Sequence, residues 1–82
     1  MTAKEMFEEL GYRYYKGNGI IRVDEVWKNS FGEIKSALVV EFDISEKWFR
    51  SKNLKFGRYI GVETYKAINK QIEELGWNNE NN

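Results

Sequence analysis

The sequence predicts a small α+β domain, with an antiparallel meander of four or five strands between a helix at each end of the chain. Three observations support this prediction. Capped helix patterns occur near both ends, segments of alternating polarity lie between them, and turn signals separate these segments at short intervals. Two helices with one apolar stripe each can cover one side of a small sheet. We therefore expect both helices on one face and solvent on the other.

The first helix is expected from Ala3 to Leu10. Thr2 stands three residues before Glu5, the spacing of a capping box, in which the two residues exchange hydrogen bonds. Apolar residues recur at helical spacing at Ala3, Met6, Phe7 and Leu10. Gly11 follows, and glycine readily adopts the left-handed conformation that ends many helices.

Two turn signals open the meander. Asn18-Gly19 is typical of a two-residue hairpin turn, because that turn needs two positive φ values, and it would pair residues 12–16 with residues 21–25. If residues 29–32 form the next loop, Lys28 lies opposite Glu33. The apolar pairs that follow are Trp27 with Ile34, Val23 with Leu38, and Ile21 with Val40, with Phe42 continuing the row. Because all of them fall on one side of the sheet, turn and pattern agree.

A third turn near residues 44–47 would bring Phe49 opposite Phe42. A fifth short strand is expected around residues 55–60. The last helix then begins after Gly61 and ends at Gly76. Its expected apolar stripe is Val62, Tyr65, Ile68, Ile72 and Leu75.

One domain is expected over residues 1–77, followed by a frayed polar tail over residues 78–82. The predicted core is Met6, Phe7, Leu10, Ile21, Val23, Leu38, Val40, Phe42, Phe49, Ile68, Ile72 and Leu75. The chain has no cysteine and no apolar run long enough for a membrane span. With no signal-peptide pattern either, we expect a cytosolic protein with no membrane association.

Catalytic function lacks its usual residues. Without histidine or cysteine there is no imidazole base, no thiol nucleophile and no histidine-ligated or thiolate metal site. Acidic side chains at Asp24, Glu41 and Asp43 lie near one another in the expected register, but Arg22 and Lys35 are placed to pair with them. We therefore expect a non-enzymatic protein with no cofactor and no metal.

Charge is unevenly distributed. The net charge is zero, yet the segment Lys47–Tyr59 contains five bases and no acid. Such a segment can attract a phosphate or an acidic partner, and it can equally be a solvated strand edge on which lysine prevents aggregation.

The expected open face of the sheet is the candidate binding surface. Its aromatic, basic and apolar side chains come from four strands, and the candidate partner-binding residues are Arg13, Tyr15, Arg22, Val39, Trp48 and Arg50. Three interpretations remain open: ordinary cross-strand packing, an interface for a protein partner or for self-association, and stacking on single-stranded nucleic acid.

Both ends of the chain show a resemblance. Residues 1–12 (MTAKEMFEELGY) and residues 66–77 (KAINKQIEELGW) resemble the termini of small phage and prophage proteins of Gram-positive bacteria, for which no function is established. The resemblance implies a small phage-encoded protein that works in the host cytoplasm, and such proteins often act by binding.

Overall fold

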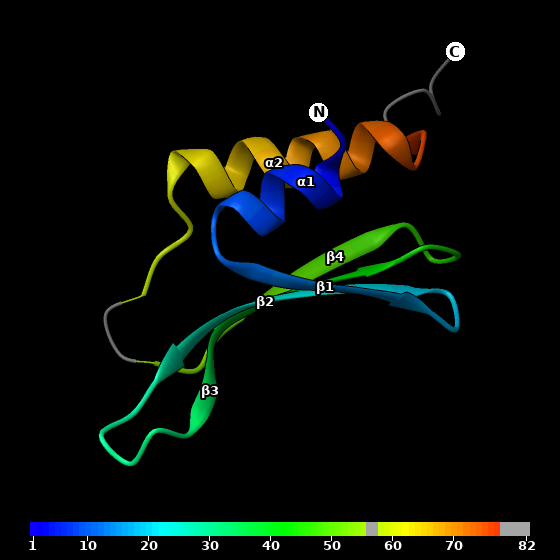
Figure 1. Ribbon diagram of the computed structural model, residues 1–82. Coiled ribbons are helices and arrows are strands. Elements are labelled where there is room, and N and C mark those ends of the chain that lie inside the picture. Colours follow the sequence, from blue (N-terminus) through cyan, green and yellow to red (C-terminus); the bar gives the residue numbers. More distant parts are fainter. Residues whose placement is uncertain (56–57, 78–82) are drawn as a thin grey trace.

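The computed structural model describes residues 1–55 and 58–77 (Figure 1). Its elements in chain order are α1 (Ala3–Glu9), β1 (Tyr12–Gly17), β2 (Ile20–Lys28), β3 (Ile34–Asp43), β4 (Trp48–Asn53) and α2 (Val62–Glu74). The strands form one antiparallel sheet in the order β1-β2-β3-β4, and both helices lie on the same side of it. The predicted α+β meander is confirmed.

The two helices are fixed to each other at their ends. Thr2 and Glu5 form the predicted capping box at the start of α1, with the Thr2 hydroxyl accepting from Glu5 N at 3.1 Å. Ala3 N then donates to the Glu74 carboxylate at 2.8 Å, which joins the first turn of α1 to the last turn of α2. Gly11, with a φ of 90°, turns the chain from α1 into β1.

The first and third hairpins have the predicted registers. Asn18 and Gly19 both have positive φ (54° and 76°), and β1 pairs with β2 from Tyr12 opposite Glu25 onward. At the third hairpin Phe49 lies opposite Phe42.

The loop of the second hairpin is one residue longer than predicted. The side-chain oxygen of Asn29 accepts hydrogen bonds from Phe31 N and Glu33 N, at 2.9 and 3.0 Å. These bonds hold Glu33 in the turn, so that Lys28 lies opposite Ile34 instead.

A β-bulge shifts the same pairing by one more residue. Ala37 has no partner of its own in β2, and the register changes there. Val23 therefore pairs with Val40 and Ile21 with Phe42, two residues away from the predicted partners. Because side chains alternate with a period of two, a shift of two keeps residues 38–43 of β3 on their predicted faces, whereas the shift of one before the bulge reverses the faces of residues 34–36.

The core lies between this face and the helices, with Phe7 of α1 near its centre. Its ring centroid is 5.5 Å from that of Tyr12 and 6.4 Å from that of Phe42. The buried residues that form this core are Ala3, Phe7, Tyr12, Ile21, Val23, Leu38, Val40, Phe42, Ala67 and Ile68. Met6, Leu10, Ile72 and Leu75 pack on this cluster but are only partly buried. Phe49 was predicted in the core and is 43% exposed, because it lies on an edge strand.

The buried face of α2 differs from the predicted stripe. Tyr65 and Val62 are exposed, at 58% and 69%, whereas Ala67 and Ile68 are buried. Two polar residues, Thr64 and Gln71, complete the buried face. Tyrosines of β1 account for the difference. The Tyr14 hydroxyl donates to Gln71 Oε1 at 2.6 Å, and the Tyr12 hydroxyl lies 3.2 Å from Thr64 Oγ1.

Beyond the ends of β1 and β4, the β2–β3 hairpin continues as a two-stranded arm that neither helix covers (Figure 1). The predicted placement of Trp27 and Ile34 in the core row is therefore wrong. Trp27 pairs with Lys35 and is half-buried, with Lys55 Nζ 4.4 Å from its ring centroid, and Ile34 is 60% exposed.

The expected fifth strand is not found in the described part of residues 55–60. After Asn53, Leu54 N donates to Ala37 O at 2.8 Å, and Lys55 and residues 58–61 are irregular. Residues 56–57 and the predicted frayed tail, residues 78–82, lie outside the described residues.

Candidate binding face of the sheet

The sheet face opposite the helices, called the open face below, carries rows of cross-strand neighbours. These rows are Ile20-Asp43-Trp48, Tyr15-Arg22-Glu41-Arg50 and Arg13-Asp24-Val39-Lys52. Every residue predicted to bind a partner lies in one of them.

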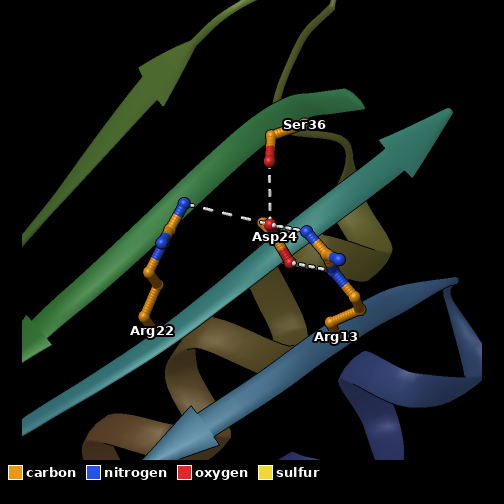
Figure 2. A network of polar contacts seen from close by, with 4 residues as sticks. All are labelled: Arg13, Arg22, Asp24 and Ser36. Carbon is orange, nitrogen blue, oxygen red and sulfur yellow. Dashed lines mark hydrogen bonds and ion pairs between the residues drawn. The ribbon is translucent and has the colours of Figure 1, made fainter. Parts of the chain in front are cut away.

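Asp24 is fully buried although it points to the open face. Arg13 donates to both of its carboxylate oxygens, from Nε at 3.0 Å and from Nη2 at 2.7 Å (Figure 2). Ser36 Oγ donates to Oδ2 at 2.8 Å, and Arg22 Nη2 lies 3.9 Å from the same oxygen. The buried charge is thus hydrogen-bonded and paired, as burial of a carboxylate requires.

These contacts also set the protonation of Asp24. Burial by itself would raise the pKa of Asp24, but hydrogen bonds from Arg13 and Ser36, together with the charges of Arg13 and Arg22, hold that pKa below its ordinary value. The hydrogen bond to Asp24 also raises the pKa of Arg13. At neutral pH the carboxylate is therefore ionised, and it holds the Arg13 guanidinium in place.

Each edge of the open face carries an arginine stacked on an aromatic ring. On β1 the Arg13 guanidinium lies 5.8 Å from the centroid of the Tyr15 ring. On β4 the Arg50 guanidinium lies 5.5 Å from the centroid of the Trp48 ring. Arg50 also donates from Nε to Glu41 at 2.9 Å. Tyr15 and Trp48 remain 49% and 41% exposed, so both pairs are accessible to a partner.

Beside the Arg50–Trp48 pair the open face is hollowed into a depression of about 440 Å³. Its lining residues are Arg22, Val39, Glu41, Arg50, Ser51, Lys52 and Leu54. Val39 was predicted as an exposed contact; it is only 6% exposed and contributes a buried wall of this depression instead. Its lining contains three cationic side chains and one carboxylate. The depression therefore suits an acidic side chain, alone or next to an apolar one.

Sequence reasoning missed three lining residues, Ser51, Lys52 and Leu54, and the burial of Asp24. Lys52 continues the alternation of Trp48 and Arg50 along β4, so extending that period would have found it. Leu54 lies past the strand and carried no such signal. The burial of Asp24 depends on Ser36, which the bulge brings to the open face, and no local pattern predicts the bulge.

Residues 1–55 and 58–77 hold no cluster of side chains that could bind a metal ion and no helix that could cross a membrane. No three acidic side chains in these ranges gather to hold a cation. Asp24 is bound to Arg13, and Glu41 to Arg50. Neither helix in the described ranges has the length and apolar character needed to cross a bilayer.

Comparison of the chain with protein-family models, with curated proteins and with solved structures found no match. Its function must therefore be inferred from its own residues.

Proposed function

We propose that this chain is a non-enzymatic accessory protein that binds a protein partner through the open face. The observation that carries the proposal is the depression flanked by the exposed Arg50–Trp48 pair. Tryptophan, tyrosine and arginine are the residues in which binding energy concentrates at protein interfaces. Because Glu41 and Trp48 already position the Arg50 side chain, less side-chain entropy is lost when a partner docks.

Single-stranded nucleic acid is the alternative partner, and the ion pairs weigh against it. The guanidinium groups of Arg13 and Arg50 already bind Asp24 and Glu41. A phosphate would have to compete with those carboxylates, and a base would have to displace a guanidinium from the ring it covers. A protein surface can instead contact the exposed edges of the same pairs without breaking them.

For context, we propose a phage-encoded protein acting in the cytoplasm of its bacterial host. The resemblance of residues 1–12 and 66–77 to small phage and prophage proteins supports this context.

The test compares the wild-type chain with a Tyr15→Ala/Trp48→Ala variant as baits in nuclease-treated bacterial lysate, with equal melting temperatures as a precondition. Both rings are exposed, so truncation should leave folding intact while reducing the captured protein at least about tenfold. In parallel, a fluorescent single-stranded oligonucleotide is titrated at low salt. Equal capture by both baits contradicts the proposal, and micromolar oligonucleotide binding that Trp48→Ala removes favours the alternative.

A further inference from the structure

The edge strand β4 is uncovered on both faces. All of its residues are exposed. Trp48, on the open face, is 41% exposed, and Phe49, on the helix side, is 43% exposed. We propose that β4 receives an extended acidic segment of a protein partner as an added strand of the sheet. This inference rests on the proposed function and names the partner's chemistry.

The backbone of β4 has unpaired hydrogen-bonding groups for such a segment. Leu54 N donates inward to Ala37 O, and backbone direction alternates along a strand. The N–H and C=O groups of Phe49, Ser51 and Asn53 therefore point away from β3, toward the open edge. Unpaired edge groups of this kind are the template for addition of a peptide strand.

The positive charge of β4 and its flanking residues favours an acidic segment as the added strand. From Lys47 to Lys55 the chain has four bases and no acid. Glu41 binds Arg50, whereas no ion pair within the described ranges involves Lys52, which is exposed and lines the depression. An acidic side chain opposite Lys52 on an incoming strand would meet it in a non-hydrogen-bonded pair, where side chains approach most closely.

The same argument disfavours a second copy of this chain as the occupant. If two β4 strands paired antiparallel about Ser51, Arg50 of each copy would lie directly opposite Lys52 of the other. Like charges directly opposite each other destabilise a sheet. A heterologous acidic strand relieves this repulsion, and a copy of β4 adds to it.

The two sides of β4 define the pattern that the segment should have. On the open face its acidic side chains would reach Lys52 and the depression beside it. On the helix side its alternate residues would lie beside Phe49, whose ring already stacks on Phe42 at 5.7 Å and favours apolar neighbours. The expected segment therefore alternates acidic and apolar residues.

A synthetic peptide of alternating glutamate and valine serves as the probe, followed by NMR with amide hydrogen exchange. We expect the amides of Phe49, Ser51 and Asn53 to exchange at least about tenfold more slowly when the peptide is bound. N-methylation of the valines, which would pair with these residues, should abolish binding. N-methylation of the glutamates should preserve it, because their N–H groups point away from β4.

Matched variants separate strand addition from simple charge attraction. Ser51→Pro removes an outward N–H that β3 does not use, so the fold should be retained and binding lost, while Ser51→Ala should bind normally. Lys52→Glu should weaken binding about tenfold, and Lys16→Glu on the opposite edge should have little effect.

The inference is wrong if the peptide does not bind at millimolar concentration, if a lysine-valine peptide binds equally well, or if the three amides stay unprotected. Protection that appears without peptide as the chain is concentrated would identify a second copy and also overturn it. If Ser51→Pro captures the partner of the Tyr15 and Trp48 surface as well as the wild type does, the proposed function stands and strand addition fails.

Discussion

Arg13 and Asp24 lie directly opposite each other on β1 and β2 and form an ion pair in which two guanidinium nitrogens bind the two carboxylate oxygens. The pair is asymmetric, because the arginine side chain is 46% exposed and the aspartate side chain only 1%. Water can solvate the arginine alone but cannot reach the carboxylate. Asp24 therefore depends on Arg13 more than Arg13 depends on Asp24.

Removing Arg13 should consequently be costly. Arg13→Ala leaves a buried carboxylate with Ser36 and a distant Arg22, and we expect it to lower the free energy of unfolding by about 1.5–3 kcal/mol. Arg50→Ala is the matched control, since its exposed pair with Glu41 contributes only about 0–1 kcal/mol. Urea denaturation of both variants measures the difference. Equal losses would show that burial of Asp24 has no energetic consequence.

Acid should weaken the same contact. The pKa of Asp24 is lowered in the folded state, so its stabilisation is complete above the unfolded-state pKa of about 3.9 and is lost as pH falls through the folded-state value. Asp24→Asn should therefore be less stable than the wild type at neutral pH, and this difference in stability should narrow as the pH falls below about 4. Denaturation curves across that range measure it. A constant gap would mean that the carboxylate does not titrate in this way.

The contact between β1 and α2 predicts a third effect. Tyr14→Phe removes the hydroxyl that donates to Gln71, whose side chain is buried, and should cost about 1–3 kcal/mol. Tyr65→Phe is the control on the exposed side of α2 and should be within about 0.5 kcal/mol of the wild type. Thermal melts compare the two. If both melt alike, the tyrosine hydroxyl does not hold the helix.

Core burial predicts a fourth effect. Leu38 is buried on β3, and Leu38→Ala should cost about 2–5 kcal/mol through lost burial and the cavity left behind. Leu54→Ala, at a position 52% exposed, is the control and should change stability little. An unchanged melting curve for Leu38→Ala would contradict the core.

Turn and cap signals predicted much of this fold because they are local. The capping box at Thr2 and the Asn18-Gly19 turn need only neighbouring residues, and both were predicted correctly. The face of α2 was not, because burial of Gln71 depends on a tyrosine 57 residues away in sequence. The bulge at Ala37 was likewise invisible, since it reflects how two strands pair over their whole length.

The face on which the candidate site lies was also predictable from a local signal, the alternation of side chains along each strand. A period of two placed Tyr15, Arg22, Trp48 and Arg50 on one face, and an error of two residues in register left that face unchanged. The ion pairs that neutralise its arginines depend on exact cross-strand neighbours. They could be identified only from the structure.

Site-specific photo-crosslinking tests the central proposal, that the open face binds a protein, most directly. A benzophenone amino acid replaces Trp48 on the open face in one variant and Tyr65 on the outer side of α2 in the other, both exposed aromatic positions. In bacterial lysate the Trp48 variant should form a protein adduct that excess wild-type chain suppresses, and the Tyr65 variant should form none. Adducts from Tyr65 alone, or equally from both positions, would contradict the account.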